Sequence, residues 1–269
     1  VLIFAALLSV AAMAVAWGVR MRTGRSGWID TIWSAAVGLA GLAAALGADG
    51  GGRRFLVAAL VVVWSVRLAA HIGARTRGAA DDPRYAELAR RWGDGFAPRL
   101  FLFLQIQAAA GFVLAFALHL AASAPAPFPG AVDFAATLVV VAGIAGEALA
   151  DAQLRRFRAG APAGSICDVG LWGWSRHPNY FFEWIVWCGF ALFCLAGLAE
   201  RPFQIAAVAA PVMMWVLLVR VSGIPPLEAH LARSRGEAHR AHVARVPAFV
   251  PRPPRRAPLR PPAPPEESP

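Results

Sequence analysis

Ionisable side chains recur at helical spacing inside segments that are otherwise apolar. Arg67 and His71 stand four residues apart, so a helix would place both on one face, and Arg75 continues the same stripe. Charged groups at membrane depth cost free energy, which makes each of them a candidate for function. Two later segments repeat this spacing with Glu147, Asp151, Arg155 and Arg158, and then with Asn179, Glu183 and Trp187.

Three such stripes would enclose a polar cavity if they faced one another. The alternative is structural, because Arg67 could pair with Glu147 or Asp151 merely to hold two helices together. A metal site is not expected, since the three cysteines lack the spacing of metal ligands.

The segment 170–187, GLWGWSRHPNYFFEWIVW, runs from a polar loop directly into an apolar stretch. Pro178 suits the first position of a helix, where its missing N–H costs nothing. Arg176 and His177 would then stand beside the unpaired amides of a helix N-terminus, a favourable place for an anion. Guanidinium groups bind phosphate through paired hydrogen bonds, so we expect a phosphate group here. The alternative is that these arginines anchor the loop to lipid headgroups.

The composition restricts the class of protein. Of 269 residues, 58% are hydrophobic and 16% are charged, and the mean hydropathy is +0.54. Soluble domains are about half apolar and about one quarter charged, so a soluble, disordered or nucleic-acid-binding protein is excluded. A helix that spans a bilayer needs about 20 apolar residues. The sequence therefore predicts an all-α integral membrane protein with seven transmembrane helices, at 1–19, 29–48, 55–73, 100–124, 131–150, 180–198 and 203–221.

The distribution of arginine predicts the orientation of these helices. All 26 basic residues are arginine, and 21 of them lie in the first, third and fifth loops and after the last span. Because cytoplasmic loops carry the excess of basic residues, we predict the N-terminus outside and the C-terminus in the cytoplasm. We expect one membrane domain over 1–251, with its cofactor half roughly at 131–251, and a disordered Pro/Arg-rich tail over 252–269.

The motif SRHPNY at 175–180, followed by Glu183, resembles the C-terminal motif of the steroid 5-alpha-reductase superfamily. Three more stretches resemble its bacterial branch of multi-pass proteins of unknown function, namely DPRY at 82–85, SGIP at 222–225 and AFVP at 248–251. The similarity extends over about residues 28–254. It implies a multi-pass protein of the bacterial inner membrane, which we expect to be a monomer.

The resemblance implies NADPH as the cofactor, bound without the G-x-G-x-x-G motif of a Rossmann fold. Asn179 and Glu183 would hold the nicotinamide carboxamide, which needs one acceptor and one donor. The stretch at 151–158 resembles the one that holds the adenosine and its phosphates. The residues predicted to bind the cofactor are Arg75, Asp151, Leu154, Arg155, Arg158, Arg176, His177, Asn179, Tyr180, Glu183, Trp187, Glu228 and His242.

The resemblance also implies the reaction, a hydride transfer to the β-carbon of a conjugated C=C bond. The substrate would be a hydrophobic enone, a 3-oxo-delta-4 steroid or another sterol- or terpenoid-like lipid. In the family an acid and a tyrosine polarise the substrate carbonyl, and the nearest counterparts here are Asp30 and Trp64. His71 is the candidate proton donor, because imidazole titrates near neutral pH.

Two other functions stay open on the sequence alone. The Arg-His-Pro motif also occurs in isoprenylcysteine carboxyl methyltransferases and phospholipid methyltransferases, so a lipid methyltransferase that uses S-adenosylmethionine is one alternative. A non-enzymatic lipid-binding membrane protein, whose arginines only set its topology, is the other.

Overall fold

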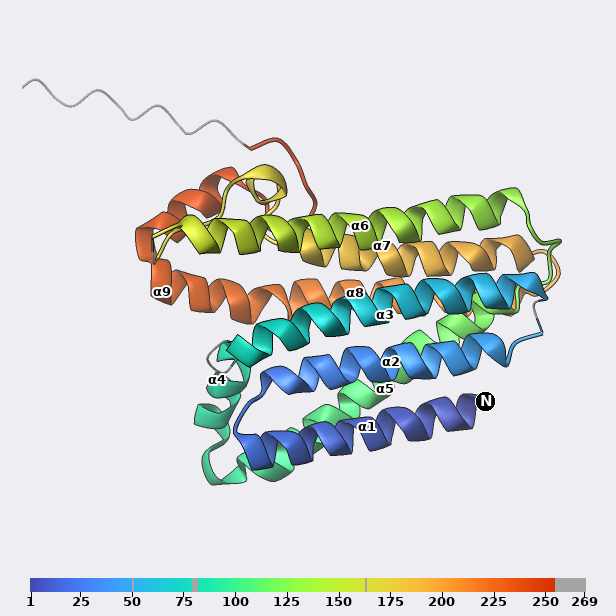
Figure 1. Cartoon of the computed structure of the whole chain (residues 1–269), viewed down its shortest axis with the longest axis horizontal. Helices are drawn as coiled ribbons and strands as arrows, with labels where there is room; N and C mark the ends of the chain where they lie inside the picture. The colour runs from blue at the N-terminus through green and yellow to red at the C-terminus, as the bar shows by residue number, and fades with distance from the viewer. Residues whose placement is uncertain (50, 79–81, 163, 255–269) are drawn as a thin grey trace, which may run out of the picture.

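The computed structural model describes residues 1–49, 51–78, 82–162 and 164–254, and this part of the chain consists of helices and loops without a β-strand. The long helices run side by side along one direction (Figure 1). Among the described residues, seven helical stretches are long and apolar enough to cross a membrane. The predictions of an all-helical protein and of seven candidate membrane spans are therefore confirmed.

Most of the helices match the predicted spans closely, and short 3-10 and π-helical turns join them. In chain order the elements are α1 (Leu2–Thr23), α2 (Gly27–Leu46), α3 (Gly52–Gly78), α4 (Pro83–Trp92), η1 (Gly93–Gly95), α5 (Phe96–Ala122), α6 (Ala131–Gly160), η2 (Gly170–Gly173), α7 (Pro178–Phe193), η3 (Cys194–Gly197), η4 (Pro202–Val208), α8 (Ala209–Val216), η5 (Leu217–Val221) and α9 (Ile224–Arg245).

The seventh predicted span is not one regular helix. It begins as the 3-10 turn η4, continues as α8 and ends as the π-helix η5. Ser222 closes this π-turn by donating its N–H to the carbonyl of Leu217, 2.8 Å away. The spacing of apolar residues predicts a span but cannot distinguish these three helix types.

The third loop holds an additional short helix, α4. The Asp82 carboxylate caps it by accepting the N–H of Arg84 at 2.9 Å, and Pro83 takes the first helical position. Burial opposes ionisation of Asp82, but hydrogen bonds and charge from Arg84 outweigh it and lower the pKa of this carboxyl group. This cap fixes where α4 starts, and so where Arg84 and Tyr85 lie.

The helices form two packed groups, α1, α2, α3 and α5 in one and α6 to α9 in the other (Figure 1), and contacts of α3 and α5 with α6, α7 and α8 join them. Helices α6 and α7 approach closely because small residues face the partner helix. A Cβ atom at Gly143 would lie 2.9 Å from the backbone nitrogen of Val186, and one at Gly146 would overlap the ring of Phe182. This contact fixes α7, which carries the SRHPNY motif at its start.

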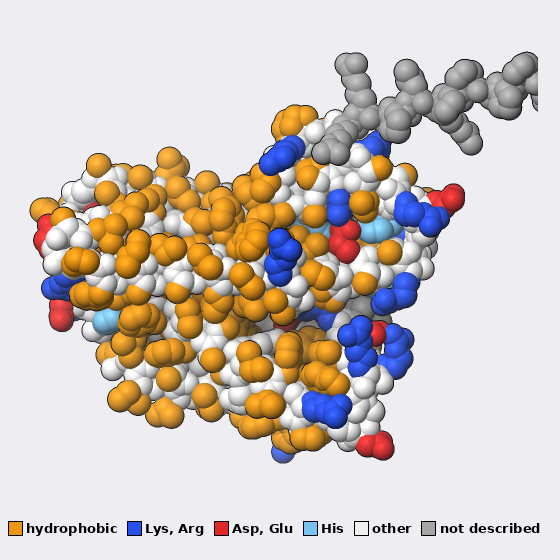
Figure 2. Space-filling model, turned by 180° about the vertical axis from the view of Figure 1, so that it is seen from behind, with side chains coloured by type: hydrophobic (Ala, Val, Ile, Leu, Met, Phe, Trp, Pro, Cys, Tyr) orange, Lys and Arg blue, Asp and Glu red, His pale blue; other side chains and the backbone are white. Residues whose placement is uncertain are grey.

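The outer surface of the bundle is strongly apolar. Ile3, Phe134 and Leu138 expose 69–79% of their area, and orange side chains cover most of the face in Figure 2. In water such a surface would be unfavourable, whereas it suits lipid tails. The structure therefore fits the predicted bilayer partner.

The C-terminal tail was predicted to be disordered from residue 252. The N–H of Arg252 instead donates to the carbonyl of Trp174 at 2.9 Å, so the beginning of the predicted tail is attached to the loop before α7. Residues 255–269, which make up the rest of that prediction, lie outside the described residues.

A buried ion pair closes the end of the bundle opposite α4 and α9. Arg53 and Asp133, exposed by only 1% and 2%, join α3 to α6 through contacts of 2.6 and 3.0 Å. Arg53 also donates to backbone carbonyls of the Pro-rich turn, among them Ala126 at 3.1 Å. Every group in this pair has a partner, as a buried charge requires.

We predict that Arg53→Ala destabilises the folded protein by about 3–5 kcal/mol, because the Asp133 carboxylate would stay buried without a counter-charge. Denaturant unfolding of the detergent-solubilised protein measures this difference. Arg54→Ala is the matched control. Arg54 lies over the ring of Phe55 at 4.7 Å, and its loss should cost about 1 kcal/mol or less. Equal effects of the two substitutions would contradict the role of the buried pair.

Candidate functional site

A cavity of about 680 Å³ lies at the end of the bundle where α4, α9 and the loop after α6 meet. Most of the arginine side chains visible in Figure 2 gather at this end of the molecule. The three polar stripes were expected to enclose a cavity, and residues of all three, on α3, α6 and α7, line it. Residues of α2 and α5 line it as well.

All but three of the predicted site residues line this cavity. Those that do are Asp30, His71, Arg75, Asp151, Leu154, Arg158, Arg176, His177, Asn179, Tyr180, Glu183, Glu228 and His242. The exceptions are Trp64, Trp187 and Arg155. Both tryptophans are fully buried in the core, and the Arg155 guanidinium lies 3.3 Å from the Nδ1 atom of His71.

Arg67 links α3 to two carboxylates of α6. One of its nitrogens lies 2.6 Å from Glu147, and another donates to Asp151. His71, one turn further along α3, places Nε2 3.5 Å from the same Asp151 carboxylate. The structural pairing considered for Arg67 therefore exists, and the carboxylates that form it also face the cavity.

The Trp64 and Trp187 indoles hold the carboxylate of Glu183. Trp64 donates to one oxygen at 2.8 Å and Trp187 to the other at 2.9 Å, while their rings pack edge to face at 5.1 Å. The placement of Trp64 at the substrate end was therefore wrong, because its N–H is already given to Glu183. Trp187 supports the site from behind and does not form its wall.

Asn179 begins the same helical face as Glu183 and lines the cavity. It is the only asparagine in the chain. Among the described residues its side-chain amide has no hydrogen-bond partner, in contrast to the Glu183 carboxylate one turn later. The amide is therefore available to a ligand.

A second polar cluster lies across the cavity, between α2, α4 and α5. The Tyr85 hydroxyl lies 3.3 Å from Asp30 and 3.5 Å from the Gln107 amide, and Arg84 donates to Asp30 as well. Sequence reasoning missed Arg84, Tyr85 and Gln107 as site residues. A signal existed in the DPRY stretch, because the chain has only two tyrosines and both line the cavity.

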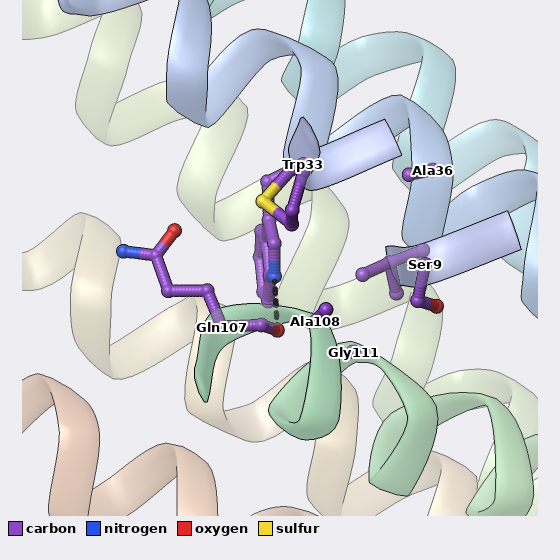
Figure 3. A pocket seen from close by; sticks show the side chains of 8 residues that line it. Ser9, Trp33, Ala36, Gln107, Ala108 and Gly111 are labelled. Atoms are coloured by element: carbon purple, nitrogen blue, oxygen red, sulfur yellow. Dashed lines mark hydrogen bonds between the residues drawn. The ribbon is translucent and has the colours of Figure 1, made fainter. Parts of the chain in front are cut away.

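Gln107 also borders a narrow gap where α1, α2 and α5 meet, too small to hold a water molecule. There its backbone carbonyl accepts the indole N–H of Trp33 at 3.1 Å, and its side chain extends away from the gap (Figure 3). This hydrogen bond fixes α5 against α2. The side-chain amide of Gln107 takes no part in it and donates to the Tyr85 hydroxyl at the cavity.

The sequence suggested that Arg176 and His177 face a free anion site. In the structure they bind a carboxylate of the protein instead. Arg176 binds Glu228 of α9 through two contacts of 2.9 and 3.0 Å, and His177 binds the same carboxylate at 2.7 Å. His239 approaches it from 3.3 Å. Glu228 therefore clamps the start of α7 to α9, and the partner of the motif is a residue 51 positions away in sequence.

Other cations of the mouth have no such partner. Arg75 and Arg158 line the cavity, and among the described residues neither has a hydrogen bond or an ion pair. Arg158 lies close enough to Arg75 and Arg235 to be repelled by both. The Nδ1 atoms of His239 and His242 are buried without a partner as well. The two unpaired guanidinium groups suit an anionic, phosphate-like ligand.

Burial lowers the pKa of His177 below its usual 6.5, although the Glu228 carboxylate opposes this shift. Both the folded and the unfolded state carry neutral His177 well above about pH 6.5. As the pH falls through this value, the unfolded state takes up a proton that the folded state resists, so stability is lost. We predict that the melting temperature falls more steeply from about pH 7.5 to pH 5.5 in the wild type than in His177→Gln. Parallel curves would contradict this assignment.

No curated protein and no solved structure matches the chain. A family model matches residues 16–246, a range that includes every residue lining the cavity. Its description is "Protein of unknown function (DUF1295)". Since the match covers well over half of the sequence, the chain belongs to the DUF1295 family.

Proposed function

We propose that this protein is an NADPH-dependent reductase of a conjugated C=C bond in a hydrophobic, sterol- or terpenoid-like enone, related to the steroid 5-alpha-reductases. The observation that carries the proposal is the shared cavity. Unpaired arginines at its mouth, a free carboxamide at the start of α7 and an apolar wall around Tyr85 all belong to it. Its volume of about 680 Å³ lies within the range of ligand sites.

The residues present fit the cofactor. Arg75 and Arg158 would hold the phosphates, because both line the cavity and neither forms an ion pair among the described residues. Asn179 would orient the nicotinamide ring, since an amide side chain can donate to and accept from a carboxamide. Glu183 contributes to the site mainly by holding its wall in place. Its two oxygens already accept indole N–H groups, and it fixes the wall of the nicotinamide pocket one turn beyond Asn179.

When bound, NADPH supplies the hydride. The chain itself supplies the group that binds the substrate oxygen. The Gln107 amide donates one N–H to the Tyr85 hydroxyl and has a second, which would stabilise negative charge on this oxygen as the C=C bond is reduced. Asp30 and Arg84 position the tyrosine, and the hydrophobic body of the substrate would lie against Trp33, Phe103 and Ile106. Gln107 thus takes the donor role first assigned to Trp64, and Tyr85, whose O–H is given to Asp30, positions it.

The arrangement supports the proposed orientation as well. The unpaired arginines and the cavity mouth lie at the same end as the loops that are rich in arginine, which the positive-inside rule assigns to the cytoplasm. The N-terminus would then lie outside the membrane, and the cavity would open to the nucleotides of the cytoplasm. We propose a monomer of a bacterial inner membrane.

Thermal unfolding of the detergent-solubilised protein with different ligands tests the proposal. We predict that NADPH raises the melting temperature, because a ligand that binds only the folded state stabilises it by mass action. NADH, which lacks the 2′-phosphate, should raise it less. A rise with S-adenosylmethionine alone would support the methyltransferase, and no response to any of the three would support a lipid-binding protein.

Asn179→Ala should weaken NADPH binding by about 1–3 kcal/mol, which is about a 5- to 150-fold higher Kd. The folded protein itself should melt as the wild type does, because the Asn179 amide has no partner among the described residues. Titration calorimetry measures the Kd, and Glu237→Ala serves as the control because this side chain is 94% exposed. Wild-type affinity in Asn179→Ala would overturn the nicotinamide role.

A further inference from the structure

The deep wall of the cavity, where α6 and α7 meet α3, has more buried carboxyl groups than cations beside them. Glu147, Asp151 and Glu183 each expose 4–6% of their area, and all three line the cavity. Arg67 is the one guanidinium that the described residues bring into contact with this cluster. Three ionised carboxylates beside one cation would leave net negative charge in a medium that solvates it poorly. The cluster must therefore bind a proton or another cation.

The hydrogen bonds show which of the three carboxyl groups is least stabilised in its ionised form. Asp151 accepts a hydrogen bond from Arg67 and also faces His71 at 3.5 Å. Glu183 accepts an indole N–H at each oxygen, an arrangement that suits a carboxylate, which only accepts.

Glu147 has the poorest partners of the three. Its Oε2 atom lies 2.6 Å from Nη1 of Arg67, but both atoms are buried without a properly directed hydrogen bond. The Asp151 and Glu183 carboxylates also repel charge on Glu147. Neighbouring carboxyl groups in one buried cluster favour a state in which one of them holds a proton.

We propose that Glu147 is a neutral carboxylic acid in the resting protein, and that it is the proton donor of the cavity. The first part stands on the carboxyl cluster alone, whereas the donor role rests on the proposed reductase. Reduction of a conjugated C=C bond adds one hydride and one proton. The O–H bond of Glu147 breaks as a C–H bond forms at the α-carbon of the substrate, which leaves Glu147 as a carboxylate.

Asp151 and His71 then complete the cycle. His71 lines the cavity one turn from Arg67 and is 18% exposed, so it can exchange protons with water at the mouth. A proton taken up there returns to Glu147 past the Asp151 carboxylate. His71 thus relays the proton, which revises the donor role that the sequence suggested.

Infrared spectroscopy of the ligand-free protein in detergent tests the first part. At about pH 7.5, exposed carboxyl groups are ionised. We expect the wild type to show the C=O stretching band of a protonated carboxyl group, shifted in D₂O and lost in Glu147→Gln. Glu237→Gln, at an exposed position, should keep the band. Gln copies a neutral acid in shape, so the melting temperature of Glu147→Gln should stay within about 2 °C of the wild type.

Absence of the band in the wild type would overturn the proposal, and stabilisation by Na⁺ would then identify a cation as the balancing charge. A band that survives in Glu147→Gln and disappears in Glu183→Gln would also overturn it. If Glu147→Gln does not fold, Glu147→Asp replaces it, and an unchanged band position there contradicts the assignment. Because no nucleotide is present, these results are independent of NADPH binding. A protein that shows the band but does not bind NADPH would contradict only the proposed reductase.

Discussion

A guanidinium inside an apolar bundle must find carboxylates, and this constraint organises the whole structure. Arg67 meets it by reaching from α3 to the Asp151 carboxylate and the Glu147 carboxyl group on α6, which joins the N-terminal helices to the C-terminal group. Removing Arg67 or Asp151 would leave a buried charge without its partner, so separating the two groups of helices costs free energy. Both carboxyl groups also line the cavity. The interaction that holds the bundle together therefore also sets the electrostatics of the site.

Carboxylates that lack an ion pair accept hydrogen bonds from neutral donors instead. Glu183 accepts two indole N–H groups and, within the described part of the chain, has no guanidinium contact, so it is held in place without a cation that would balance the cluster. Farther out, Glu228 binds Arg176 and His177 and so fixes the loop that starts α7. Each carboxylate has a different kind of partner. The charged groups therefore change along the cavity. Carboxyl groups line its deep wall, and arginines without an ion pair among the described residues line its mouth.

The sequence predicted the spans and the polar stripes because both follow from local rules, the length of an apolar run and the period of a helix. It also raised the pairing of Arg67 with Glu147 or Asp151 as an alternative, and both contacts exist. It could not predict which stripes meet, since Trp64 and Glu183 are 119 residues apart and nothing in their spacing relates them. For the same reason Arg176 was expected to bind an anionic ligand, whereas its guanidinium group binds the Glu228 carboxylate of a later helix. Tyr85 was missed because its position depends on the short helix α4.

The two ends of the bundle differ in how their guanidinium groups are paired. At the Arg53 end, the guanidinium makes contacts with Asp133 and with backbone carbonyls, and its buried charge is fully paired. At the cavity end, imidazole nitrogens of His239 and His242 are buried without partners, and Arg158 faces other arginines. Unpaired buried polar atoms occur at both ends, since Arg54 Nε and the Gln204 amide also lack partners among the described residues. What distinguishes the cavity end is that its unpaired guanidinium groups, those of Arg75 and Arg158, line a cavity large enough for a ligand. A lipid-binding role that uses only the apolar wall would leave these guanidinium groups unexplained.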